Sequence, residues 1–199
     1  MRITFVRHGE SKRNKKRIIQ KQVAGGLTRK GRNQAKRLAE RLSGEFFDII
    51  YCSDAERAKE TAREIIRFHR KTPIKYTKKL REMNAGDYIG ASWEEYGNAR
   101  EESMDGFAKF KPIGGESIEE MVKRIGSLFN RLYKAHNEQH ILLVTHGGAN
   151  KALKHLIERG SSEPVRDEGY EQDNCCVNVM EYDGKNSKLI LYNCTKHLR

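Results

Sequence analysis

Residues 5–9 read FVRHG and residues 143–148 read LVTHGG, so two short apolar runs end in nearly the same way. Such runs predict buried β-strands. A histidine follows each strand, and a glycine that allows a sharp turn follows each histidine. Ligands of open α/β sheets bind beyond the carboxyl ends of the strands. We therefore predict that His8 and His146 lie in one pocket at that edge of a sheet.

Strand-like and helix-like segments alternate along the rest of the chain. Strands are expected at residues 3–7, 47–52, 141–145, 176–182 and 188–192. Helices are expected after the caps Thr28, Asp54 and Ser117 and after the second histidine, with stops at Gly44 and Gly160. This alternation predicts one domain over residues 1–199, an α/β fold built as a three-layer αβα sandwich around a mostly parallel central sheet. Residues 84–114 fit least well and are expected to form a small irregular cap insertion.

The composition is typical of a soluble globular protein, because 37% of the 199 residues are hydrophobic and 33% are charged. No apolar run is long enough for a membrane-spanning helix and no signal peptide is recognisable, so we expect no membrane partner and a cytoplasmic location. The cysteines form no CxxC pair, which favours reduced thiols. There is also no HxH, HExxH or aspartate-rich cluster, and we expect neither a metal nor a cofactor.

The formal net charge of +12 is concentrated near the first histidine. Residues 1–40 hold thirteen Lys or Arg, but only Glu10 and Glu40 as acids. One interpretation is a solvated basic surface, and the other is a field that attracts polyanions. Cations beside a histidine suit phosphoryl transfer better than metal binding, because the charge of a phosphoryl group must be neutralised while nitrogen attacks phosphorus.

The residues around His8 resemble a known signature. RHGES at residues 7–11, followed by Asn14, resembles the RHGE motif of the histidine phosphatase superfamily, which includes the phosphoglycerate mutases. Further segments resemble the motifs of that family in the family's order: residues 27–35, 53–62, 80–90, 114–117 with Arg124, 145–148 and 174–177. A lone RHG would be weak, whereas a full set of motifs in order is specific.

The resemblance implies a role for each matched residue. His8 would accept the phosphoryl group and become phosphohistidine, and Glu82 would protonate the leaving oxygen and later deprotonate water. The other implied ligands of the phosphoryl group are cations or N–H donors: Arg7, Arg57, His146 as a cation, Asn14 and the backbone of Gly147. The step would need no metal.

One loop departs from the family pattern. Gln20 is present, but Lys21 stands where the family usually has glycine, and Ala24 where it usually has aspartate. Both changes make the loop more positive in a region that faces the substrate in relatives. We predict that Gln20 and Lys21 bind substrate.

Three functions are compared. Cofactor-dependent mutases of the family carry a long, arginine-rich insertion before the GGES motif, whereas Arg100 is the only arginine of that stretch here. We therefore predict hydrolysis of a small anionic phosphorylated metabolite, with a cofactor-dependent phosphoglycerate mutase as the alternative. Nucleic-acid binding through residues 12–37 is a more remote alternative, because that segment has no recognisable nucleic-acid-binding motif. The physiological substrate and the oligomeric state stay open.

Overall fold

The computed structural model describes residues 1–159 and 171–199. Its centre is a sheet in which the strands are ordered β3-β2-β4-β1-β5-β6. The strands are β1 (Arg2–Arg7), β2 (Ile49–Ser53), β3 (Ile74–Thr77), β4 (His140–Thr145), β5 (Val177–Tyr182) and β6 (Ser187–Cys194). Strands β1 to β4 are parallel, whereas β5 is antiparallel to β1 and β6 to β5. The prediction of a mostly parallel sheet is confirmed.

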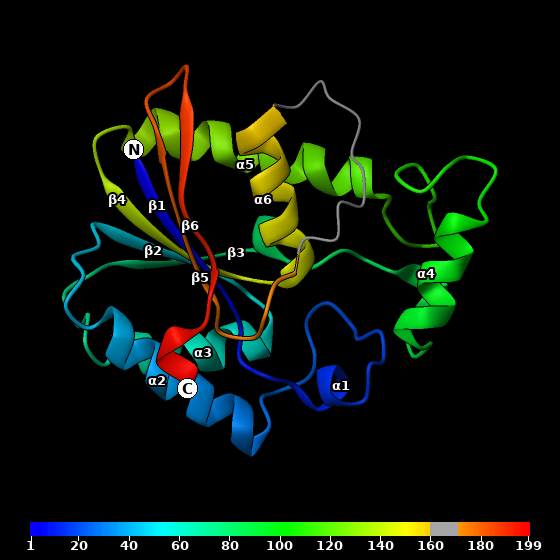
Figure 1. The fold of residues 1–199 in the computed structure, drawn as a ribbon, viewed down its shortest axis with the longest axis horizontal. Helices are drawn as coiled ribbons and strands as arrows, with labels where there is room; N and C mark the ends of the chain where they lie inside the picture. The colour runs from blue at the N-terminus through cyan, green and yellow to red at the C-terminus, as the bar shows by residue number, and fades with distance from the viewer. Residues whose placement is uncertain (160–170) are drawn as a thin grey trace.

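Helices cover both faces of the sheet. They are α1 (Lys12–Lys15), α2 (Arg29–Leu42), α3 (Glu56–Ile66), α4 (Trp93–Glu101), α5 (Ile118–His136) and α6 (Gly147–Arg159). Figure 1 shows α2 and α3 on one side of the sheet, α5 and α6 on the other, and α4 set apart from it. The predicted three-layer sandwich is therefore confirmed. Gly160, the predicted stop of α6, lies outside the described residues.

The central strands are apolar on both faces, as a sheet covered on both sides requires. On β4, Ile141 and Leu143 pack into the core under α5 and α6, and Leu142 and Val144 pack into the core over α2 and α3. Neighbouring β1 alternates in the same way. The resulting double burial holds the carboxyl ends of both strands rigidly, which is where the two histidines follow.

Two helix caps form as predicted, and one does not. The hydroxyl of Thr28 accepts from the backbone N–H of Gly31, and Ser117 forms a capping box with Glu120. The prediction that Asp54 caps α3 is wrong, because Ala55 occupies the cap position without a side-chain bond. The carboxylate of Asp54 instead accepts two hydrogen bonds from the guanidinium of Arg81, at 2.6 and 2.5 Å. A bidentate ion pair is stronger than one bond to a helix N–H.

Residues 84–114 leave the sheet and carry α4, a helix that the sequence pattern does not predict. The segment after α1 holds this cap in place through backbone hydrogen bonds. Ile19 N–H donates to Ala91 O at 2.9 Å, and Trp93 N–H donates to Arg17 O, also at 2.9 Å. The cap is thus tied directly to the segment that follows the RHGES motif.

Candidate active site

The two predicted histidines meet at the carboxyl edge of the sheet. Because Arg7 on β1 is in register with Thr145 on β4, the residue after each strand lies beside the other. The rings of His8 and His146 lie with their centroids 5.1 Å apart, and both side chains are buried. The turn after His8 requires glycine, since a Cβ on Gly9 would lie 2.4 Å from a backbone oxygen of the α2 N-terminus.

The contacts of His8 fix its tautomer. Its Nδ1 lies 2.7 Å from the carbonyl oxygen of Gly9, and a carbonyl can only accept, so Nδ1 carries the proton. Nε2 accepts from Nε–H of Arg57 at 3.1 Å, which requires a lone pair on Nε2. Burial, helped by the charges of Arg57 and Arg7, holds the pKa of His8 well below its usual value. These contacts favour a neutral imidazole whose Nε2 carries the lone pair that a nucleophile needs.

Arg57 is fully buried in the first turn of α3. Its Nη1 donates to the carbonyl oxygens of Gln22 at 3.1 Å and of Lys21 at 3.3 Å. Burial lowers the pKa of Arg57 to about 10, although the negative charge of Glu82 acts in the opposite direction. The guanidinium thus stays charged at neutral pH, and its position is fixed by the loop that follows α1.

Three buried nitrogen atoms near His8 have no hydrogen-bond partner among the described residues. They are Arg7 Nε, Arg57 Nη2 and His146 Nδ1, which come from three different elements. An unsatisfied buried donor costs about 1–3 kcal/mol, and more when the group is charged. Their convergence on one imidazole indicates a site for an anion with several oxygen atoms.

The contacts of His146 bear on its protonation. Its Nε2 lies 2.8 Å from Ser53 Oγ, which itself accepts from the N–H of Ala55. The serine proton is then free to bond Nε2, and this leaves Nδ1–H as a donor without a partner among the described residues. Burial, together with the charges of Arg57, His8 and Arg7, lowers the pKa of His146 well below its usual value. This favours the neutral form of His146, and a cationic His146 during phosphoryl transfer stays a prediction.

The remaining predicted ligands lie around this centre, with one exception. Asn14 lines the cavity, and its Oδ1 accepts from Ser11 N–H at 3.2 Å, which leaves its amide N–H groups for a ligand. Gln20 and Gly147 also line the cavity. The side chain of Lys21 is exposed and lies outside the lining, so only its carbonyl oxygen reaches the site, through Arg57.

Glu82 lies at the N-terminus of α6. Its carboxylate accepts from the N–H of Gly148 and from the N–H of Met83, each at 3.0 Å. Glu82 lines the same cavity as His8 and Arg7, and its charge raises the pKa of Arg7 against the effect of burial. An acid and His8 thus share one cavity.

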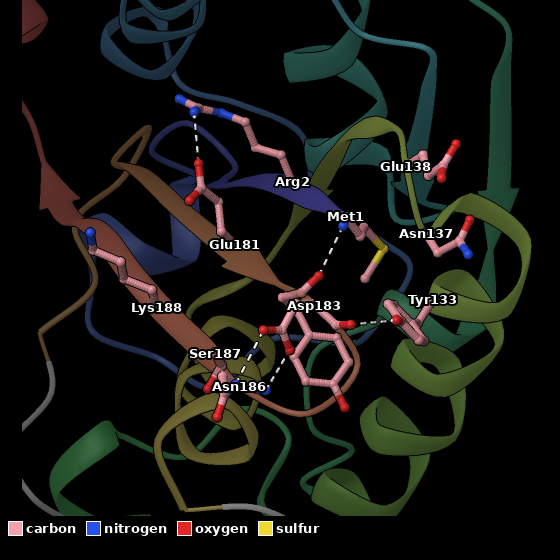
Figure 2. Close-up of a pocket in the computed structure, with 11 residues that line it drawn as sticks. Met1, Arg2, Tyr133, Asn137, Glu138, Glu181, Asp183, Asn186, Ser187 and Lys188 are labelled. Carbon is pink, nitrogen blue, oxygen red and sulfur yellow. Dashed lines mark hydrogen bonds and ion pairs between the residues drawn. The ribbon is translucent and has the colours of Figure 1, made fainter.

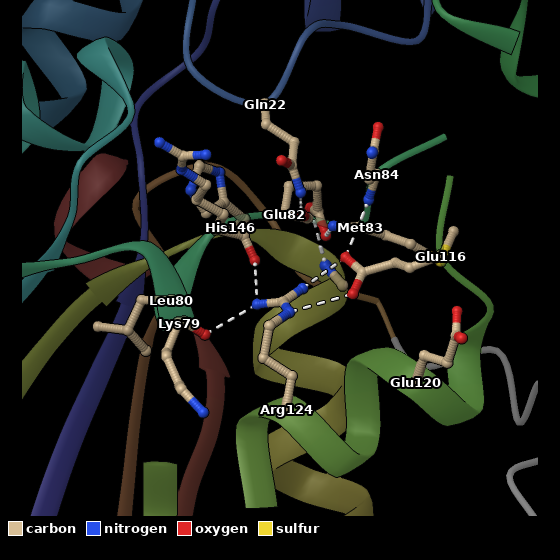
Figure 3. Close-up of polar contacts among 12 residues, drawn as sticks. Gln22, Lys79, Leu80, Glu82, Met83, Asn84, Glu116, Glu120, Arg124 and His146 are labelled. Atoms are coloured by element: carbon tan, nitrogen blue, oxygen red, sulfur yellow. Dashed lines mark hydrogen bonds and ion pairs between the residues drawn. The ribbon is translucent and has the colours of Figure 1, made fainter. Parts of the chain in front are cut away.

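A set of polar contacts holds the Glu82 segment (Figure 3). Arg124 on α5 donates to the carboxylate of Glu116 at 2.6 and 3.1 Å and to the carbonyl oxygens of Lys79 and Arg81 at 2.8 and 3.1 Å. Glu116 also accepts from the N–H of Asn84 at 3.0 Å. The two side chains belong to the GGES motif, for which the sequence offers a pattern but no role. Their contacts assign them to fixing the backbone on both sides of Glu82.

Two more residues contact the site, and sequence reasoning gives them no role. The amide of Asn174 donates to the carbonyl oxygen of His8 at 2.9 Å. The amide of Gln22 donates to the carbonyl oxygen of Glu82 at 2.7 Å. Asn174 lies in a recognised motif, which was a usable signal, whereas nothing in the sequence distinguishes Gln22 from other loop amides.

The cavity over His8 has a volume of about 840 Å³. Its floor is the catalytic centre, one wall is the face of α6 that carries Gly147 and Lys151, and the facing wall includes Trp93 and Tyr96 of α4. This volume exceeds what a phosphate alone needs and falls in the range of small-molecule sites.

A second hollow, of about 650 Å³, lies near the amino end of β1 and is lined by Met1, Arg2, Tyr133 and Asp183 among others (Figure 2). It opens at the opposite end of β1 from the histidines. The N-terminal amine donates to the carbonyl oxygen of Tyr182 and Arg2 pairs with Glu181, so these two cations have partners within the protein. Arg7, whose Nε has no hydrogen-bond partner among the described residues, lines the first cavity instead.

Within the described part of the chain, no group of three or more His, Cys, Asp or Glu side chains could hold a metal ion. No helix there is long and apolar enough to span a membrane.

Comparison with known proteins agrees with this geometry. The family model described as histidine phosphatase superfamily (branch 1) matches residues 3–195. The chain belongs to this family. Phosphoglycerate mutase-like protein 4 of Arabidopsis thaliana is 34% identical over 203 residues, which cover 98% of this chain and 86% of that protein. A metal-independent phosphoserine phosphatase of Arabidopsis thaliana is 32% identical over 80% of this chain and 70% of that protein.

A solved structure of phosphoserine phosphatase from Entamoeba histolytica, in complex with 3-phosphoglyceric acid, has a TM-score of 0.85 at 26% identity. The match covers 100% of this chain and 99% of the Entamoeba histolytica chain. An adenosylcobalamin/alpha-ribazole phosphatase of Escherichia coli is also similar, at 28% identity over 97% of this chain and 96% of that protein. These relatives support a phosphatase over the mutase alternative.

Proposed function

We propose that this phosphatase hydrolyses small anionic phosphomonoesters through a phosphohistidine on Nε2 of His8. The observation that carries the proposal is the arrangement of three unpartnered buried nitrogens, on Arg7, Arg57 and His146, around that one nitrogen lone pair. A phosphoryl group has the charge and the number of oxygens to satisfy them.

The first half-reaction forms the N–P bond. Nε2 of His8 attacks phosphorus, the bond from phosphorus to the ester oxygen breaks, and Glu82 in its acid form gives its proton to the leaving oxygen. In the second half-reaction Glu82 takes a proton from water, the water oxygen attacks phosphorus, and the P–N bond breaks. Inorganic phosphate leaves, and both residues return to their starting forms.

The charges of the site match this sequence. The guanidinium groups of Arg7 and Arg57 balance a phosphate dianion, and Nδ1–H of His146 adds a neutral donor. Because these groups are already held by the protein, they need not reorganise as charge moves from the leaving oxygen to the phosphoryl group. This supports a transfer that uses protein groups throughout.

The test is transfer of labelled phosphate to the enzyme. Incubation with a labelled phosphomonoester and rapid quenching should give acid-labile, base-stable label on the wild type. His8→Ala should lose both the label and turnover, whereas His136→Gln at the C-terminus of α5 should keep both. Turnover at the wild-type rate in His8→Ala would refute the proposal. Label passed to a second alcohol rather than to water would favour the mutase alternative.

A further inference from the structure

The proposed reaction leaves one cation of the cavity wall without a task. Lys151 lines the cavity from α6, and its side chain is half-buried. No hydrogen bond or ion pair joins it to another of the described residues. A half-buried ammonium that has lost part of its water, and that pairs with no acid among residues 1–159 and 171–199, favours an anionic ligand.

The helix fixes how far this cation lies from the phosphoryl site. Gly147 and Lys151 are four residues apart on α6, hence on one face and about 6 Å apart along the helix axis. Gly147 itself packs on Arg7, because a Cβ there would lie 3.4 Å from Arg7 Nε. The ammonium of Lys151 is thus within the length of a short carbon chain attached to the phosphate.

A count of charges leads to the same conclusion. With a phosphate dianion bound, Arg7 and Arg57 are neutralised, and Glu82 is uncharged in the acid form that the first step requires. Among the described residues, the charge of Lys151 then has no counterpart on the buried side of the cavity. The acids that share the lining, Glu101, Glu171 and Asp173, are exposed, so water screens their charges.

We propose that Lys151 forms a subsite for a carboxylate, and that the preferred substrates are phosphomonoesters of short hydroxy acids. This inference rests on the proposed function, since it assigns the organic part of the same substrate. According to this proposal, the selectivity for anionic substrates comes from one residue of α6 and not from the exposed lysines after the RHGES motif. Trp93 and Tyr96 of α4 close the cavity on the side that faces the carbon chain.

The matched substrates are 3-phosphoglycerate and sn-glycerol 3-phosphate, which differ in a carboxylate against a hydroxymethyl group. The kcat/KM of the wild type for 3-phosphoglycerate should be about tenfold to a hundredfold higher than for sn-glycerol 3-phosphate, which is the effect expected of one charge-assisted hydrogen bond. Lys151→Met removes the charge and keeps the length of the side chain, so it should erase this preference. The kcat/KM for sn-glycerol 3-phosphate should change by less than about twofold.

Two control variants separate a subsite from a general field. Lys16→Met removes an equal charge from an exposed side chain outside the cavity lining and should keep the preference. Lys151→Arg keeps the charge and should retain most of the preference for 3-phosphoglycerate. Equal losses in Lys16→Met and Lys151→Met would overturn the subsite and assign selectivity to long-range attraction.

Binding is measured by calorimetry in the His8→Ala background, where neither ligand should be turned over. The dissociation constants of the two ligands should differ in the presence of Lys151 and converge in Lys151→Met. Equal dissociation constants for the two ligands in the His8→Ala protein with Lys151 present would overturn the subsite, whichever reaction the wild type catalyses. Hydrolysis of both substrates at equal rates likewise overturns it and leaves the phosphohistidine mechanism intact. Failure to hydrolyse any phosphomonoester, with the difference in binding preserved, would refute the function and keep the subsite.

Discussion

Replacing Arg124 by methionine should impair the acid step without touching the phosphoryl site. The guanidinium of Arg124 makes two hydrogen bonds to Glu116 and two to the backbone carbonyls at positions 79 and 81. Methionine keeps much of the packing volume and removes all four bonds. The segment that carries Glu82 then loses its main contact with α5.

The loss of stability can be estimated from the same contacts. Removing one partner of a buried ion pair costs about 3–5 kcal/mol. The side chains of Arg124 and Glu116 keep exposures of 20% and 16%, so water replaces part of the lost interaction. We expect a loss of about 2–3 kcal/mol, or a decrease in Tm of about 4–12 °C for a chain of this size.

The kinetic consequence depends on the leaving group. A positioned general acid contributes about 10²–10⁴-fold, so Glu82→Gln should lose about that factor on an alkyl phosphate and much less on p-nitrophenyl phosphate, whose leaving oxygen needs little protonation. Arg124→Met, measured well below its Tm, should show the same selectivity with a loss of about tenfold on the alkyl substrate.

A double variant decides the case. If Arg124 acts through Glu82, Arg124→Met should cost nothing further on alkyl phosphates once Glu82→Gln is present. Equal losses of Arg124→Met on alkyl and aryl substrates, or losses that multiply in the double variant, would refute a positioning role and leave only a contribution to stability.

Three further predictions follow from the site. His146→Ala should lower kcat on aryl phosphates by about a hundredfold or more, as loss of one donor to the phosphoryl group does, and undiminished turnover would remove His146 from the site. Burial lowers the pKa of His8 and of His146, so below pH about 6.5 the unfolded chain binds more protons than the folded protein. The free energy of unfolding should therefore fall by up to about 1.4 kcal/mol for each group with every unit by which the pH is lowered. Urea midpoints between pH 7.5 and 5.5 should show this slope, and His8→Ala should reduce it. Because Lys16 and Lys21 are exposed and lie outside the cavity lining, charge reversal at both should leave the difference in salt dependence of kcat/KM between a multiply charged and a singly charged substrate unchanged, and a flattened difference would give these lysines a part in substrate choice.

Much of the fold follows from local patterns. The strands and helices around the two histidines follow from apolar runs and caps, because double burial demands near-continuous apolar strands. Strand β3 (Ile74–Thr77) and helix α4 are missed. β3 is a short edge strand, with exposed residues at its centre, and it pairs only with β2. The face that α4 buries is dominated by Tyr96 alone, so no apolar stripe marks it as a helix.

The candidate site is predictable where chemistry and position coincide, and it is not predictable where contacts are made through the backbone. The pairing of His8 with His146 follows from two similar strand ends. The lowered pKa of His146 does not, because it depends on complete burial beside two guanidinium groups. The place of Lys21 was also beyond the sequence, since a positive loop near the substrate says nothing about which way each side chain points.

Lys21 and Ala24, which differ from the residues expected from the family resemblance, lie in the loop that contacts Arg57. Arg57 holds the loop through carbonyl oxygens, including that of Gln22 at 3.1 Å, and Gln22 in turn donates to the carbonyl oxygen of Glu82 at 2.7 Å. Contacts to a carbonyl oxygen do not depend on the side chain of the residue that supplies it, so Lys21 and Ala24 can replace glycine and aspartate without loosening Arg57. The chemistry is therefore insulated from these changes, whereas the exposed surface beside the cavity is not. A change of side chain at position 21 or 24 should therefore leave the contacts that join Arg57 through Gln22 to Glu82 in place.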